Sequence, residues 1–249
     1  MRKLFLCILL CISSRLIYAQ ENVKANYGSG VSGKNLLKIN LLSLPLGNFS
    51  FEYERVVANK ITVGMGYRFM PKSGIPLKST ISNLIDDPDT EAQLDQFKTS
   101  NSAITPELRF YLGKEALRGF YLGPFVRISN YKLDGPFEYD VNNNPETLPL
   151  VGKLNTVTGG LLIGAQWKLG GGIYLDWWTL GPQYGSANGS LTAKQSLSQA
   201  QQDELRPELE ALEIPFAETK TTVNAQGARV DITGPWAGLR AGLCLGLRF

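Results

Sequence analysis

The final segment of the chain alternates strictly between two kinds of residue. Counting back from Phe249, every second residue is apolar as far as Ala237, and the residues between them are glycine, cysteine or arginine. Because successive side chains of a β-strand point to opposite faces, this segment predicts a strand with one apolar and one small or charged face. Such a strand fits a sheet whose two faces meet very different surroundings.

The same two-residue period recurs in seven earlier segments. The predicted strands are 35–44, 48–55, 61–69, 104–112, 119–132, 154–169, 172–182 and 237–249. Short turns are expected at 58–59, 113–118 and 170–171, and long connections at 70–102, 133–153 and 183–234, while Pro45–Gly47 is short where a long link would fit. An even strand number with tight turns at one end and long loops at the other is typical of outer-membrane barrels. The pattern therefore predicts an all-β fold, an eight-stranded antiparallel transmembrane β-barrel with short turns and long extracellular loops.

The first residues have the pattern of a secretory signal. Arg2 and Lys3 precede a nearly pure apolar run from Leu4 to Ile12, and Ala19 offers a small residue at a cleavage point. The run is shorter than the ~20 residues that a membrane-spanning helix needs. We therefore expect a signal peptide at 1–19, a flexible lead-in at 20–34 and the barrel at 35–249, in the outer membrane of a Gram-negative bacterium.

Composition removes several classes of function. The chain has no histidine, which excludes an imidazole base or metal ligand, and of its three cysteines only Cys244 follows the signal. Three of the 25 basic residues lie in the signal, which leaves 22 against 22 acidic residues. No affinity for nucleic acid follows from that balance. We expect no enzyme activity, no cofactor and no nucleic-acid partner.

Charged residues occupy the strand face opposite the apolar one. In an eight-stranded barrel they would project into an interior that side chains fill, and buried charges persist only when they are paired. We therefore expect a charge lattice in the lumen rather than a catalytic pair. Its predicted members are Lys38, Glu52, Glu54, Arg68, Glu107, Arg109, Arg127, Lys168, Asp176, Arg240 and Arg248.

Two of the long connections carry further signals. Asp87, Asp89 and Glu91 have the alternate spacing of a Ca²⁺ loop, although Ala92 replaces the turn glycine, so they are weak candidates. The alternative is a set of acidic residues at a helix N-terminus, with a helix over 89–97. A second helical region is expected at 194–213, where Pro207 predicts two short helices or a kink.

Two stretches carry a resemblance. Residues 38–42 and 47–55 (KINLL and GNFSFEYER) resemble the opening hairpin of a Bacteroidetes-type family of outer-membrane barrels whose function is unknown. The C-terminal strand resembles the signal that barrel-assembly machinery recognises, carried here by Leu243, Leu245, Leu247 and Phe249. The resemblance implies an outer-membrane barrel and no established activity.

The favoured function is a structural role, or an interaction through the long loops 70–102, 133–153 and 183–234 with an extracellular partner. The expected partners are otherwise outer-membrane lipid and, during biogenesis, the assembly machinery. Three alternatives stay open at this point. They are a secreted or periplasmic lipocalin-like barrel that binds a ligand, narrow-pore transport past the small inward residues, and a membrane-embedded enzyme.

Overall fold

The computed structural model describes residues 33–76, 80, 95–141, 144–211 and 216–249. Contacts divide the chain into a unit at Met1–Val31 and a unit at Ser32–Phe249, and only the second contains described residues. The predicted signal peptide, most of the lead-in, most of the predicted helix at 89–97 and the Ca²⁺ candidates Asp87, Asp89 and Glu91 lie outside the described residues.

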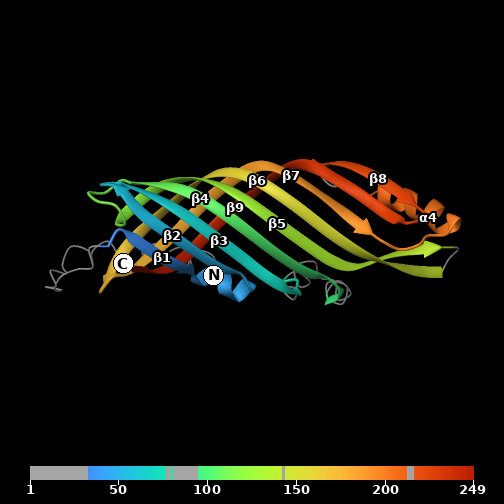
Figure 1. Cartoon of the computed structure of the whole chain (residues 1–249), viewed down its shortest axis with the longest axis horizontal. Coiled ribbons are helices and arrows are strands. Elements are labelled where there is room, and N and C mark those ends of the chain that lie inside the picture. The colour runs from blue at the N-terminus through green and yellow to red at the C-terminus, as the bar shows by residue number, and fades with distance from the viewer. Residues whose placement is uncertain (1–32, 77–79, 81–94, 142–143, 212–215) are drawn as a thin grey trace, which may run out of the picture. The chain divides into compact units, whose positions relative to one another are not determined.

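Eight strands close into a ring in which every pairing is antiparallel. The described elements are β1 (Asn35–Asn40), η1 (Leu41–Leu46), β2 (Phe49–Ala58), β3 (Ile61–Gly74), β4 (Lys98–Tyr111), β5 (Gly119–Val141), β6 (Asn144–Gly170), β7 (Ile173–Ala193), α4 (Gln199–Glu210), β8 (Glu218–Asn224) and β9 (Gly227–Arg248). Neighbours in sequence pair from β1 to β7, β7 pairs with β9, and β9 returns to β1 with Lys38 opposite Gly246. Figure 1 shows these strands winding side by side.

The alternation seen in the sequence divides the ring into an inner and an outer face. On β5, the inward Arg127 is 5% exposed, whereas its outward neighbours Val126 and Ile128 are 47% and 54% exposed. The polarity is therefore the reverse of a water-soluble barrel, with charge inside and apolar side chains outside.

The first predicted strand, 35–44, is wrong in its second half. β1 ends at Asn40, and residues Leu41–Leu46 form the 3₁₀ helix η1. The Asn40 side chain accepts a hydrogen bond from Leu42 N at 3.0 Å, and Gly47 closes the helix with a φ of 66°. Pro45 has no N–H to donate to a sheet, so a continuous strand is disfavoured here.

Two of the three predicted long connections, 133–153 and 183–234, contain long stretches of strand. Residues 133–153 continue β5 and β6 as a hairpin that stays paired as far as Val141 and Asn144. β7 continues to Ala193, and the last connection also contains β8, which pairs with the start of β9 and is a ninth strand in the described part of the chain. Backbone hydrogen bonds between strands do not depend on the side-chain pattern. The strands therefore continue beyond the residues at which the apolar alternation stops.

The region 194–213 contains one described α-helix, α4, with Pro207 inside it, so the expectation of two short helices is wrong. Ser198 caps it, accepting from Gln201 N while the Gln201 side chain accepts from Ser198 N. Leu205 and Leu209 are buried in a core with Leu148 and Val230 of the extended strands. Figure 1 places α4 at the end where β5, β6, β7 and β9 reach past the other strands, and we call this part the extension.

No helix among the described residues combines the length and the apolar character needed to cross a bilayer.

Candidate functional site

The centre of the ring is an ion-pair network around Lys38 on β1. Its Nζ lies 2.6 Å from Glu52 Oε1, 2.6 Å from Glu54 Oε2 and 2.7 Å from Asp176 Oδ2. Each of these side chains is at most 5% exposed. One ammonium group on β1 therefore binds carboxylates of β2 and β7, two strands that do not pair with each other in the sheet.

Arg109 on β4 is the second cation of this network. Its Nε donates to Glu107 Oε1 at 2.5 Å, its Nη1 donates to Asp176 Oδ2 at 2.6 Å, and its Nη2 donates to Glu52. Its guanidinium also lies over the ring of Tyr121, with 4.4 Å from Cζ to the ring centroid. With Glu54 Oε2 at 3.4 Å from Nη1, the planar, multiply donating head of arginine links four carboxylates.

Neutral donors bind the second carboxylate oxygens of Glu54 and Asp176. Tyr111 Oη donates to Glu54 Oε1 at 2.6 Å, and Thr62 Oγ1 donates to the same oxygen at 2.5 Å. Tyr121 Oη donates to Asp176 Oδ1 at 2.7 Å. Tyr121 and Thr62 did not enter the predicted lattice because only charged residues were sought. Their inward parity on the strands is the signal that would have found them.

Inward glycines make room for the charged side chains. A Cβ at Gly246 would lie 2.7 Å from Lys38 Cγ, and one at Gly64 would lie 2.8 Å from Glu107 Cγ. A Cβ at Gly242 would lie 3.1 Å from the Trp178 ring. Neighbouring side chains therefore occupy the space beside these three glycines, which disfavours a water path along them.

Three of the carboxylates also have the geometry of a cation site. Ligand oxygens of Glu52, Glu54 and Asp176 lie within 4.8 Å of one another. Lys38 Nζ contacts all three, so the chain itself supplies the positive charge that a metal ion would bring. The network links strands of the ring, and its charged side chains are buried.

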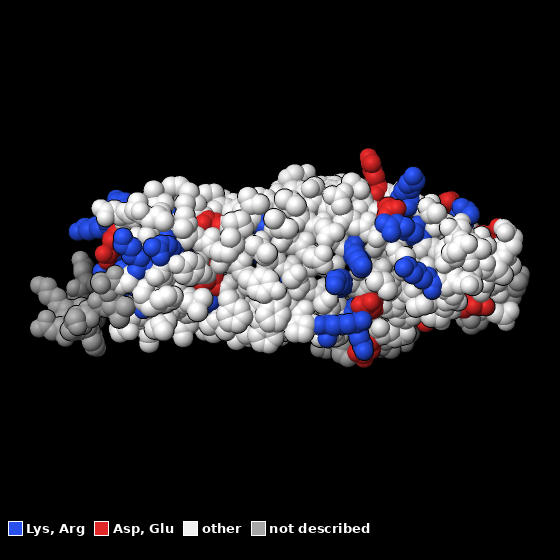
Figure 2. Space-filling model, viewed as in Figure 1, with Lys and Arg blue, Asp and Glu red and all other residues white. Residues whose placement is uncertain are grey.

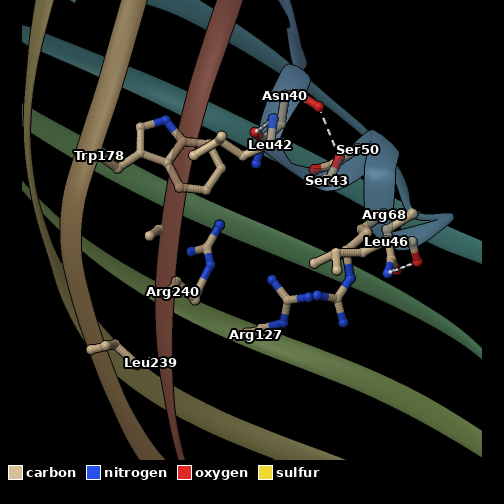
Figure 3. Close-up of a pocket in the computed structure, with 12 residues that line it drawn as sticks. Asn40, Leu42, Ser43, Leu46, Ser50, Arg68, Arg127, Trp178, Leu239 and Arg240 are labelled. Atoms are coloured by element: carbon tan, nitrogen blue, oxygen red, sulfur yellow. Dashed lines mark hydrogen bonds between the residues drawn. The ribbon is translucent and has the colours of Figure 1, made fainter. Parts of the chain in front are cut away.

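Three further arginines of the predicted lattice lie apart from this network, around a cavity of about 270 Å³ (Figure 3). Arg68, Arg127 and Arg240 have no carboxylate oxygen within 4.0 Å among the described residues. Arg127 donates to Ser129 Oγ at 3.2 Å and to Thr105 Oγ1 at 3.4 Å. We call these three residues the arginine triad.

The remaining two predicted members, Lys168 and Arg248, lie near the short-turn end. Lys168 is exposed, because it sits two residues before Gly170, where the ring ends and solvent begins. Including it in the lattice was wrong. Arg248 is half-buried and has neutral partners, donating to Gly33 O at 2.6 Å and to Tyr174 Oη at 2.8 Å. It therefore caps that end of the ring instead of joining the network.

The proposed assembly residues all face outward. Leu245, Leu247 and Phe249 are 41%, 57% and 53% exposed, and Leu243 is partly exposed on the same face. Leu243, Leu245 and Leu247 lie on the ring-closing strand β9 and Phe249 directly follows it, and their role in assembly stays a prediction.

The closed antiparallel ring, its charged interior and its apolar outer face define the class of protein as a β-barrel of inverted polarity. The chain belongs to a family described as "Protein of unknown function (DUF3575)", whose model matches residues 5–186. The expectation of a barrel family of unknown function is confirmed to that extent, and an origin in Bacteroidetes stays a prediction.

Two further comparisons complete this picture. No curated protein matches the chain. Among solved structures, the chain is similar to the translocator domain of the autotransporter NalP from Neisseria meningitidis. That match has a TM-score of 0.31 and 10% sequence identity, and it covers 96% of each chain.

Proposed function

We propose that this protein is an outer-membrane β-barrel with a closed lumen, which presents its extension to a partner outside the membrane. The observation that carries the proposal is the inverted polarity of the ring. A water-soluble monomer rarely leaves a contiguous apolar surface of more than a few hundred Å² uncovered. Here outward leucine, isoleucine, valine and aromatic side chains occur on every strand of the ring.

The height of the apolar surface supports membrane insertion. On β5 the outward apolar residues run from Phe120 to Ile128, which matches the ~9–11 residues that a tilted strand needs to cross a bilayer. The next outward cross-strand pairs are Asn130 with Asn155 and Lys132 with Lys153. In Figure 2 the middle of the visible face is nearly free of charge, and Lys and Arg gather on both sides of it.

The same polarity speaks against a lipocalin-like ligand barrel. Such a protein would bury apolar side chains in its interior for a ligand and expose polar ones to water. The largest fully buried side chains of this ring instead include Arg109, Lys38 and Glu54. The membrane-embedded enzyme also loses support, since the carboxylates are engaged by cations and shielded from substrate.

The ion-pair network supports a structural role over narrow-pore transport. Lys38 and Arg109 bridge strands on opposite parts of the ring, and any ion passing through would have to displace them from buried carboxylates. Breaking buried pairs leaves uncompensated charge, at a cost of about 3–5 kcal/mol. We therefore infer that the lumen stays shut and that the extension carries the contact with other molecules.

The outward apolar side chains of the ring strands form a band that we call the apolar belt. The outer surface of the extension is basic next to this belt. A cavity of about 520 Å³ there is lined by Lys153, Lys194 and Arg229 together with neutral residues. Arg229 donates to Asp231 Oδ1 at 2.8 Å, and this hydrogen bond lowers the pKa of the Asp231 carboxyl. These groups lie where an anionic partner or membrane surface would meet the protein.

Cell fractionation tests the proposed location. We expect the mature protein in the outer-membrane fraction, soluble only in detergent, with heat-modifiable migration on a gel. Recovery in the soluble periplasmic or extracellular fraction without detergent would contradict membrane residence. Planar-bilayer recording of the pure protein tests the closed lumen, and a stable conductance of porin size would revive transport.

A further inference from the structure

The arginine triad defines a cavity with an excess of unpaired positive charge. Arg68 lies on β3, Arg127 on β5 and Arg240 on β9, and Figure 3 shows their guanidinium groups converging on one space. The cavity has a volume of about 270 Å³, at the small end of ligand pockets. It is also lined by the amide and hydroxyl groups of Asn40, Ser43, Asn48 and Ser50.

Each arginine of the triad has a buried nitrogen without a hydrogen-bond partner. These atoms are Arg68 Nε, Arg127 Nη2 and Arg240 Nη1. Arg240 lies instead over the rings of Phe125 and Trp178, with 4.5 Å and 5.0 Å from Cζ to the ring centroids. A buried donor left unsatisfied is costly, and more so when it is charged. The site is therefore built to receive acceptor oxygens.

The balance of charge in the ring points to an anion. The network around Lys38 and Arg109 has two cations and four carboxylates, and the triad adds three cations. The interior thus holds five cations against four carboxylates, one positive charge in excess. The nearest carboxylates, Glu52 and Glu107, already accept from Arg109, so they offset the triad only at a distance.

The cavity lies at a break in the wall of the ring. β9 pairs with β8 as far as Thr233 and with β1 from Cys244 onward, and in the described part of the chain no strand fills that side of β9 in between. Helix η1 lies beside this break and contributes Leu42, Ser43 and Leu46 to the cavity. The outward, 66% exposed Leu239 lines it from β9, so the cavity reaches the outer face.

We propose that the arginine triad binds a phosphate-type oxyanion, brought in by a free anion or by the headgroup of a lipid. Guanidinium groups bind phosphate through paired, charge-assisted hydrogen bonds, and three of them would surround such a group. The hydroxyl of Ser50 also lines the cavity, whereas Ser43 and Asn48 donate to Asn40 O and to Leu46 O within the chain. The opening beside Leu239 gives an entry path for a headgroup whose acyl chains stay on the apolar outer face.

The test uses the full mature chain folded in a nonionic detergent with a Tris chloride buffer. Chloride is replaced by inorganic phosphate at constant ionic strength, and calorimetric titration and the unfolding midpoint are recorded. Because a ligand that binds the folded state stabilises it, we expect phosphate to bind and to raise the midpoint. Arg127→Gln and Arg240→Gln should each weaken binding by roughly tenfold or more, as loss of a charge-assisted hydrogen bond does.

Arg118→Gln is the matched control, because Arg118 is an exposed arginine of the short turn after β4 and lies outside this cavity. Its phosphate response should equal that of the wild type. If a Gln variant fails to fold, Arg127→Lys keeps the charge while removing the paired geometry and should still weaken binding. A structural role alone predicts otherwise, namely no phosphate response in the wild type and variants destabilised equally in phosphate and chloride. The absence of a phosphate response would exclude a free anion as the ligand, and the proposal would be overturned if phosphatidic acid were not retained either.

Lipid vesicles distinguish the two sources of the anion. The protein is folded into phosphatidylcholine with or without phosphatidic acid, and co-purified lipid is measured by native mass spectrometry. Retention of phosphatidic acid by the wild type and its loss in Arg240→Gln would assign the site to a headgroup. A response to inorganic phosphate without lipid retention would assign it to a free anion. No response in either arm would refute the site.

Discussion

Lys38 on β1 and Asp176 on β7 lie 2.7 Å apart in the centre of the ring, although 138 residues separate them in sequence. Both side chains are fully buried. β9 stands between their strands in the sheet, so this contact ties the two ends of the chain together around the closing strand.

Replacing Lys38 tests the network directly. Lys38→Met keeps much of the side-chain volume but leaves Glu52, Glu54 and Asp176 without their shared cation. We expect the free energy of unfolding to fall by about 3–5 kcal/mol, measured by urea titration in lipid vesicles. The control Lys168→Met removes an exposed lysine that has the same alternating position on its strand. Its free energy of unfolding should stay within about 0.5 kcal/mol of the wild type. Equal stability of the two variants would show that the network contributes little.

The inward glycines offer a steric test. Gly246→Ala would place a methyl group 2.7 Å from Lys38 Cγ and 3.2 Å from Leu37 O. We therefore expect the free energy of unfolding to fall by about 1–3 kcal/mol. At Gly66 the nearest atom to an added Cβ is 3.5 Å away, an ordinary contact, so Gly66→Ala is the matched control. Unfolding curves that place Gly246→Ala level with Gly66→Ala would mean that the lumen has spare room.

The outward face of β9 can be tested with charge. Leu243→Arg would put a cation in the middle of the apolar belt, which costs about 2–4 kcal/mol at the midplane of a bilayer. Thr233→Arg, at an exposed position in the extension, should have a free energy of unfolding within about 0.5 kcal/mol of the wild type. Folding yield and stability in vesicles provide the measurement. A Leu243→Arg protein that folds like the wild type would show the face assignment to be wrong.

The extension should unfold independently of the ring. Leu205 is fully buried in its core, so Leu205→Ala should cost about 2–5 kcal/mol locally and make α4 sensitive to protease. Heat-modifiable migration of the ring should persist, because the ring packs separately. Glu208→Ala, on the exposed side of α4, is the control and should leave protease resistance unchanged. Loss of the ring together with α4 would show a single cooperative unit.

The two-residue alternation predicted the ring because its apolar outer face and its charged interior impose opposite demands on neighbouring residues. At 61–69 and 237–249 that demand is strict, and both segments are ring strands. Beyond the apolar belt the alternation stops. Residues 133–153 contain Gly135 and Pro136, which are typical of a loop, but backbone pairing continues the hairpin there. Residues 41–44 were predicted as the end of a strand, but the cap at Asn40 begins a 3₁₀ helix there.

The division of the inward charges into two groups could not be predicted. Parity along a strand says which face a residue occupies, whereas its height in the ring depends on the stagger between strands. That stagger brings Arg109 level with Asp176, whereas Arg127 and Arg240 have no ion pair with a carboxylate in the described part of the chain. Sequence reasoning therefore found the members of both groups and assigned them to a single lattice.

Trp177 and Trp178 offer the most direct measurement of the central claim, since adjacent side chains on β7 point to opposite faces. Trp178 is buried in the lumen with an exposure of 4%, and Trp177 lies on the outer face. Two single-tryptophan proteins, with the other three tryptophans replaced by phenylalanine, would be folded into vesicles whose acyl chains carry bromine. A lipid-embedded ring with a closed interior predicts strong quenching of Trp177 fluorescence and weak quenching of Trp178. Equal quenching of both, or stronger quenching of Trp178, would contradict it.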